Sequence, residues 1–247
     1  IVNGKEELEI VIVHEVGHNW FYGLLGSNER DHAWMDEGLN TLNEMRYIET
    51  KYPKNERMSD MMMGMADKIH LEHLDHHDMS DMSYSLSAGY GIDQPIELTS
   101  DDYSPVNYGA IVYAKTGLVF TYLKDYLGDT LFDKCMQTYF DEWHYKHPQP
   151  EDLRKSLETT SGKDLGWLFD DIIPTTAQID YSIKKVKYDD KGATVTLKNT
   201  GQVIVPVSVD AISKGKVRTT MWLESGEKKG TLYFEGTTFD QFTIDSE

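Results

Sequence analysis

Hydrophobic residues follow two different patterns along this chain of 247 residues. As far as about residue 172, apolar positions recur three and four residues apart, which is the spacing of helices with one buried face. This pattern predicts helices over residues 8–25, 34–52, 55–78, 107–127, 130–145, 150–160 and 164–172. Serine and glycine interrupt the pattern between residues 80 and 102, where we expect a loop.

Beyond Pro174 the pattern changes to short runs of Val, Ile, Thr and Tyr that are separated by turn signals such as Asn199-Thr200-Gly201. Such runs are typical of strands, and we expect a small β-sandwich of about six or seven strands over residues 178–247. The predicted fold class is therefore mainly α with a β domain. We expect a helical domain at residues 1–174 and the β-sandwich domain at residues 175–247.

The first predicted helix, residues 8–25, is apolar on nearly every side, so we expect it to be buried. It contains His14-Glu15-Val16-Gly17-His18. Positions i and i+4 share one face of a helix, so His14 and His18 can bind a single ion, with Glu15 beside them. Glu37 follows His18 after eighteen intervening residues. It is the natural third ligand, because two imidazoles and one carboxylate suit a catalytic zinc with an open fourth position.

The alternative is a buried helix with two hydrogen-bonded histidines and no metal, but the joint spacing and context favour the metal. Both motifs resemble those of the gluzincin aminopeptidases, the family of membrane alanyl aminopeptidase and leukotriene hydrolase. The sequence His18-Asn19-Trp20-Phe21 resembles the family's His-x-Trp-Phe, and residues 34–38, Trp-Met-Asp-Glu-Gly, resemble its Trp-Leu-Asn-Glu-Gly. The resemblance implies one Zn²⁺ per chain, held by His14, His18 and Glu37, with Glu15 as the general base. It also implies the α-helical half of a thermolysin-like zinc metallopeptidase domain.

A third motif lies in residues 108–117, Tyr-Gly-Ala-Ile-Val-Tyr-Ala-Lys-Thr-Gly. It resembles the family's Tyr-x-Lys-Gly helix, in which the tyrosine donates a hydrogen bond to the oxyanion, and this role falls on Tyr113. Tyr108 matches a second active-site tyrosine. Thr116 stands where the family usually has glycine, which puts the local helix packing in doubt. Without the resemblance, Tyr113 would be read as a packing residue.

Two further groups of residues have open interpretations. Glu44 lies two helical turns after Glu37 and resembles the second glutamate of the family's Glu-Gly helix, so it would orient a histidine ligand. A solvated surface glutamate is the alternative. His70, His73, His76 and His77 have a spacing that could bind a second metal, but a solvated, titrating helix face is the favoured interpretation.

Charge and composition limit the partners. The formal charge of −18 argues against binding nucleic acid, because phosphate recognition depends on clustered Lys and Arg. No run of eighteen apolar residues occurs, so we expect no membrane segment in this chain. The chain begins at Ile1, a dozen residues before the metal motif, and lacks the family's amine-binding Gly-x-Met-Glu-Asn strand. We therefore expect that the N-terminal strands belong to an upstream domain of the same protein.

The resemblance implies that the substrates are peptides, and that the enzyme is a zinc-dependent aminopeptidase that removes N-terminal residues. Two alternatives remain at this stage. One keeps the zinc but changes the chemistry, as in an epoxide hydrolase or an endopeptidase. The other is a catalytically silent scaffold that binds a protein partner, which would have no reason to keep ligands, base and tyrosine together.

Overall fold

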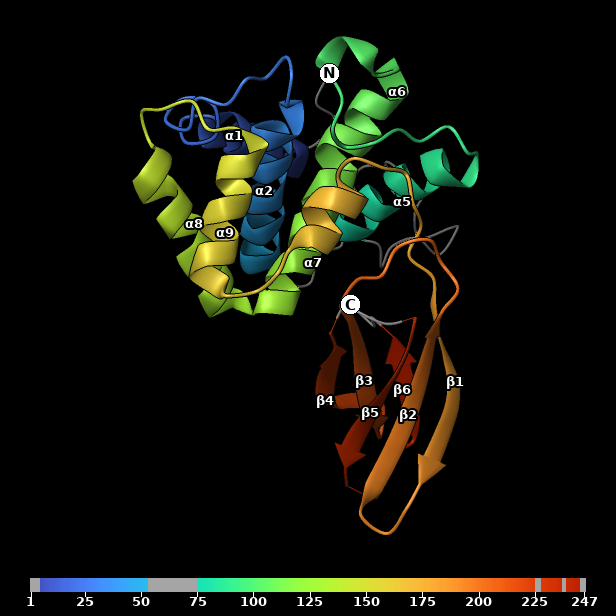
Figure 1. The fold of residues 1–247 in the computed structure, drawn as a ribbon. Helices are drawn as coiled ribbons and strands as arrows, with labels where there is room; N and C mark the ends of the chain where they lie inside the picture. The colour runs from blue at the N-terminus through green and yellow to red at the C-terminus, as the bar shows by residue number, and fades with distance from the viewer. Residues whose placement is uncertain (1–4, 53–74, 225–227, 237–238, 245–247) are drawn as a thin grey trace. The chain divides into compact units, whose positions relative to one another are not determined.

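The computed structural model describes residues 5–52, 75–224, 228–236 and 239–244. The chain forms two compact units, residues 1–163 and residues 164–247 (Figure 1). The first is helical, and the second contains two antiparallel sheets, so the predicted fold class is confirmed. The division falls after residue 163, whereas the expected domain boundary was residue 174. The short helix η4 (Trp167–Ile172) therefore belongs to the second unit.

The helical unit is arranged around α2, which contacts α1, α5, α7 and the π-helix η3. Its buried face carries Leu39, Leu42, Met45 and Ile48, each at most 1% exposed. The elements of the unit are α1 (Lys5–Gly17), η1 (Ala33–Met35), α2 (Glu37–Lys51), α5 (His76–Gly89), η2 (Ser100–Asp102), α6 (Pro105–Asn107), η3 (Tyr108–Lys115), α7 (Thr116–Leu127), α8 (Asp129–Trp143) and α9 (Pro150–Ser161). None of the described helices is both long and apolar enough to cross a bilayer.

The first helix differs from its prediction in length and in burial. It ends at Gly17, and residues 18–25 form turns that residues 145 and 146 hold through backbone hydrogen bonds. Its apolar residues Leu8, Val11, Ile12 and Val16 are 43–51% exposed. The expectation of a fully buried helix was wrong, because the described part of the chain packs only one side of α1, against α2.

The expected loop at residues 80–102 was also wrong, because most of its first half belongs to helix α5. This helix begins with a capping box: the Asp75 side chain accepts a hydrogen bond from the Asp78 backbone, and the Asp78 side chain accepts one from the Asp75 backbone. Such a box satisfies N–H groups that a helix start otherwise leaves unpaired. The helix predicted at residues 55–78 lies mostly outside the described residues, apart from its last four residues, which are the cap and the first three residues of α5.

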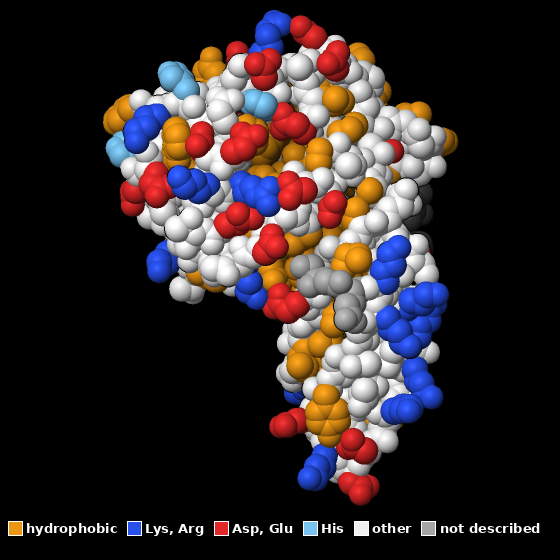
Figure 2. Space-filling view, viewed as in Figure 1, with side chains coloured by type: hydrophobic (Ala, Val, Ile, Leu, Met, Phe, Trp, Pro, Cys, Tyr) orange, Lys and Arg blue, Asp and Glu red, His pale blue; other side chains and the backbone are white. Residues whose placement is uncertain are grey.

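The second unit contains six described strands in two three-stranded antiparallel sheets, ordered β1-β2-β5 and β4-β3-β6. The strands are β1 (Tyr181–Tyr188), β2 (Gly192–Asn199), β3 (Val207–Ser213), β4 (Lys216–Leu223), β5 (Lys229–Glu235) and β6 (Gln241–Ile244). Apolar residues of both sheets, including Val195, Val209 and Phe234, form the core. Figure 2 shows Lys and Arg gathered along one side of this unit, and β1 contributes the exposed Lys184, Lys185 and Lys187.

Two glycines of the helical unit allow helices to approach closely. A Cβ atom at Gly17 of α1 would overlap the side-chain amide of Asn40 on α2, and this amide donates a hydrogen bond of 2.7 Å to the His14 carbonyl. A Cβ atom at Gly38 would overlap the side chain of Thr116 on α7. Each glycine therefore brings the first turns of α2 against a neighbouring helix.

The Gly38 contact yields a stability prediction. We expect Gly38→Ala to lower the free energy of unfolding by about 1–3 kcal/mol, the usual cost of overpacking a filled interior. The new methyl group would overlap Thr116 and approach the Val112 carbonyl oxygen. Urea denaturation followed by far-UV circular dichroism measures the effect.

Gly109→Ala is the matched control, because no atom lies within 4 Å of the added Cβ at that helical position. We expect it to leave stability unchanged or to raise it by about 0.5–1 kcal/mol. A Gly38→Ala variant as stable as wild type would contradict the close-packing argument.

Candidate metal centre

The three predicted metal ligands lie together where α1 ends and α2 begins. The Glu37 Oε2 atom is 2.9 Å from His14 Nε2 and 3.3 Å from His18 Nε2. One potential ligand atom from each residue lies within 4.8 Å of the other two. Glu37 is the first residue of α2, and the histidines occupy the last turn of α1 and the residue that follows it. The two helix ends therefore present two imidazoles and one carboxylate to a common point.

The other ring nitrogen of each histidine is already hydrogen-bonded. His14 Nδ1 lies 2.9 Å from Glu44 Oε2, and His18 Nδ1 lies 3.1 Å from the Phe21 carbonyl oxygen. An ionised carboxylate and a carbonyl can only accept, so Nδ1 is the donor in both rings. In the neutral form of each ring, Nε2 then carries the lone pair that a metal would bind, which is the usual arrangement around metal-binding histidines. The donor set therefore fits a zinc ion with an open position.

Negative charge dominates the surroundings of His14. Burial alone would lower the pKa of this imidazole, but hydrogen bonds and charges from Glu37 and Glu44 raise it to about 9. Burial opposes ionisation of Glu37, yet the hydrogen bonds from His14 and Tyr113 hold the pKa of its carboxyl group below the usual value. Two ionised carboxylates in a partly buried site stabilise a positive charge, and a divalent cation would satisfy both.

Asp36 is a buried acid that the sequence analysis did not single out. It is 3% exposed, and its Oδ1 atom has no hydrogen-bond partner among the described residues. Burial, followed by the neighbouring charge of Glu37, raises the pKa of its carboxyl group to about 7. The Asp36 carbonyl oxygen accepts a hydrogen bond of 3.1 Å from the backbone N–H of Asn40 in the first turn of α2. Around neutral pH this side chain therefore adds less than a full negative charge.

Tyr113 contributes a hydroxyl group to the same site. Its side chain is hydrogen-bonded to Glu37, and its ring centroid lies 5.6 Å from that of His14. Burial, together with Glu37, raises the pKa of this phenol well above its usual value. Tyr113 therefore stays protonated and remains a hydrogen-bond donor across the physiological pH range.

The backbone that carries Tyr113 is a π-helix, where the sequence pattern predicted an ordinary helix. In an α-helix, residues five apart point about 140° away from each other, because each residue turns the chain by about 100°. A π-helix has hydrogen bonds between residues five apart, which stacks those residues along its axis. Tyr108 and Tyr113 are five residues apart, and their ring centroids are 5.9 Å from each other. The wider turn thus brings both tyrosines to one side.

Thr116 directly follows this π-helix and is the first residue of α7. Its contacts explain why position 116 does not require the glycine that the sequence comparison led us to expect. Its Oγ1 atom donates a hydrogen bond of 3.0 Å to the Ile111 carbonyl oxygen, and its methyl group fills the space beside Gly38. The close approach of α2 and α7 therefore relies on the glycine of α2. The departure at Thr116 leaves Tyr113 in contact with the site.

Glu15 is exposed at the end of α1, one residue after His14. Successive residues of an α-helix differ by about 100° in direction, so the Glu15 side chain leaves the helix to one side of the two imidazoles. The exposure leaves this carboxylate accessible to water. Glu15, the expected base, is not one of the three grouped ligand residues.

Glu44 is buried, so the interpretation as a solvated surface residue was wrong. It is 7% exposed, and its two carboxylate oxygens bind two different histidines. Oε2 lies 2.9 Å from His14 Nδ1, and Oε1 lies 2.6 Å from His76 Nε2. The solvated histidine face predicted from the sequence does not hold for His76, whose side chain is 18% exposed. His70 and His73 lie outside the described residues, so for them the favoured solvated face and the alternative of a second metal site both stay untested.

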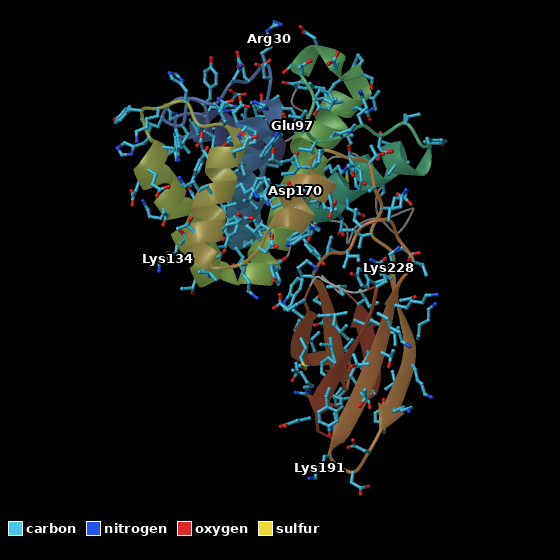
Figure 3. All side chains as sticks on the ribbon, viewed as in Figure 1. Arg30, Glu97, Lys134, Asp170, Lys191 and Lys228 are labelled. Carbon is cyan, nitrogen blue, oxygen red and sulfur yellow. The ribbon has the colours of Figure 1, made fainter. Side chains whose placement is uncertain are left out.

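A second carboxylate, Glu97, fixes the segment before α2 (labelled in Figure 3). Its Oε1 atom lies 2.5 Å from His32 Nδ1, and its Oε2 atom accepts a 2.5 Å hydrogen bond from Trp34 Nε1. Both partners, His32 and Trp34, lie in the short segment before Glu37. No sequence motif indicated Glu97, because its role depends on a contact between residues more than sixty positions apart.

Comparisons with known proteins find a matching family model and several relatives. The Peptidase family M1 domain matches residues 2–172. Aminopeptidase M1-C of Oryza sativa subsp. japonica is 25% identical over 225 residues, which cover 86% of this chain and 23% of the relative. Aminopeptidase M1 of Arabidopsis thaliana is 24% identical over 233 residues, covering 90% of this chain and 24% of the relative. The chain thus spans about a quarter of the length of these relatives.

The fold is also similar to that of a solved structure, the Legionella pneumophila aminopeptidase A in complex with aspartic acid. The TM-score is 0.61 at 16% sequence identity, and the match covers 93% of this chain and 24% of that chain. At this identity the likeness concerns the fold alone. It includes the described elements of both units, since the match extends over nearly the whole chain.

Proposed function

This chain belongs to peptidase family M1, and from that premise we propose that it forms the metal-binding part of a zinc-dependent aminopeptidase that acts on peptides. The observation that carries the proposal is the convergence of His14, His18 and Glu37, with both Nδ1 atoms engaged elsewhere. The named relatives are aminopeptidases, which supports removal of N-terminal residues over internal cleavage.

The ligand residues, Glu15 and Tyr113 each have a role in the proposed hydrolysis of a peptide bond. Zinc, when bound by His14, His18 and Glu37, would supply a Lewis acid that polarises a carbonyl group and makes water a stronger nucleophile. Glu15 accepts the proton of the attacking water and then delivers it to the leaving amine. Tyr113 donates its hydroxyl proton in a hydrogen bond to the oxygen that gains negative charge.

The rival functions differ in what they predict for this site. A catalytically silent scaffold would need neither the three metal ligands nor the exposed carboxylate of Glu15. An epoxide hydrolase or an endopeptidase would keep these residues but release other products. Analysis of the products that the full-length protein releases from a peptide with a free N-terminus separates them. Single amino acids released from that end support the proposal, and internal cuts or an unchanged peptide contradict it.

Zinc binding is the first prediction. We expect one zinc ion per chain, and we expect His18→Ala to lose it because only two ligands remain. His144→Ala is the control, since this histidine contacts Phe140 and Tyr145 rather than the site. Elemental analysis after dialysis against a weak chelator measures the content. A wild-type chain without stoichiometric metal, even after zinc is supplied, would contradict the proposal.

The second prediction concerns the base. In the full-length protein, Glu15→Gln should lower turnover by about 10²- to 10⁴-fold, because a positioned general base contributes on this scale. The variant should keep its zinc, since Glu15 lies outside the ligand set. Loss of zinc along with activity would instead make Glu15 a ligand or a structural residue.

The third prediction concerns the tyrosines. Tyr113→Phe should lower kcat by about 10²- to 10³-fold, the usual effect of removing one oxyanion donor, with little change in folding. Tyr108→Phe is the matched control and should have the smaller effect, since the site carboxylate bonds to Tyr113. Near-wild-type rates for both variants would remove Tyr113 from the mechanism.

A further inference from the structure

We propose that His76 is a positioning residue of the metal centre: it fixes Glu44, and through Glu44 it orients the imidazole of His14. The assignment rests on the proposed zinc site. The three residues come from three helices, α5, α2 and α1, and form one continuous chain of hydrogen bonds. His76 is therefore two hydrogen bonds away from the point where the ligand atoms converge.

The geometry of Glu44 shows why this outer histidine matters. Oε2 lies 2.9 Å from His14 Nδ1, and Oε1 lies 2.6 Å from His76 Nε2. Since a carboxylate can only accept, both rings donate to it. The two bonds hold the carboxylate plane from opposite ends and prevent rotation of its terminal torsion, which is otherwise broad. With only one of them, the plane could turn and the His14 ring could follow it.

Burial makes the second bond hard to replace. The Glu44 side chain is 8% exposed and that of His76 is 18% exposed, so water has little access to Oε1. A buried carboxylate oxygen without a donor is unfavourable, and the side chain would shift to find one. In the described part of the chain, His76 supplies the donor to Oε1 while Oε2 keeps its bond to His14.

Helix α5 is built to hold His76 in place. His76 is the first residue of the helix, directly after the Asp75 cap that the Asp78 backbone and side chain complete. The Ser80 Oγ atom donates a hydrogen bond to the His76 carbonyl oxygen. The helix contacts both α2 and the π-helix η3 of Tyr113. Helix α5, whose residues from position 80 onward the sequence pattern assigned to a loop, thus supports the site through its first residue.

The first experiment measures metal affinity in the chain itself. We expect His76→Leu to weaken zinc binding by about tenfold, the lower end of what loss of an outer hydrogen-bond partner costs. Competition with a chromophoric chelator gives the dissociation constant, and the visible spectrum of the cobalt-substituted chain reports the ligand geometry, which should change. His77→Leu makes the same change one residue later and should alter neither quantity.

A second pair of variants covers the case in which His76→Leu does not fold. Glutamine can place its amide nitrogen near the position of imidazole Nε2, whereas asparagine is too short to reach Glu44. We therefore expect His76→Gln to bind zinc like wild type and His76→Asn to bind it more weakly. Equal affinities for Gln, Asn and wild type, with an unchanged cobalt spectrum, would overturn the assignment.

A double-mutant cycle tests whether His76 acts through Glu44. In a Glu44→Gln background the chain of bonds is already altered, so His76→Leu should cost much less than it does in wild type. The same loss in both backgrounds would show that His76 acts by another route and would contradict the proposal. A wild-type chain that binds no zinc would overturn the proposed function as well, whereas tight wild-type binding with an unaffected His76→Leu would overturn this assignment alone.

Discussion

The candidate site depends on how closely the end of α1 approaches the start of α2. The two histidines belong to one helix end and the carboxylate to the other, so the ligand set exists only at this separation. Gly17 permits it, because any side chain there would overlap Asn40. Asn40 then donates a hydrogen bond of 2.7 Å to the His14 carbonyl oxygen, which also accepts one of 3.3 Å from the His18 backbone at the helix end. The glycine and the amide thus set the spacing and satisfy the backbone together.

The opposite ends of the two helices are joined by a separate contact. Glu9 of α1 accepts hydrogen bonds from Tyr47 and Tyr52 and pairs with Lys51. Lys51, then the two tyrosines, lower the pKa of this carboxyl group to about 2. The crossing of α1 over α2 is therefore fixed at two points, and the ligand atoms lie at one of them.

The sequence predicted that His14, His18 and Glu37 lie together, because much of their geometry is local. Two histidines four residues apart on a helix share a face in any fold, and Glu37 carries a recognisable context. Glu44 was ambiguous, since its burial depends on α5, and His76 was placed on a solvated face because nothing local distinguishes it from His77. The apolar residues of α1 predicted burial that the described chain does not supply. The π-helix was not predicted either, because its eight residues are nearly all apolar or aromatic and so do not define a period.

The site draws its polar groups from four segments that are distant in sequence: the end of α1, the first two turns of α2, the start of α5 and the π-helix η3 (Figure 1). Glu37 and Glu44 both lie on α2, and each binds a different nitrogen of His14. This ring is therefore held on both sides by carboxylates of one helix, while Tyr113 and His76 bind the same carboxylates from two other elements. Any displacement of η3 or α5 relative to α2 would reach the ring through these acids. Tight packing of α1, α5 and η3 on α2 is thus a condition for the proposed chemistry as well as for the fold.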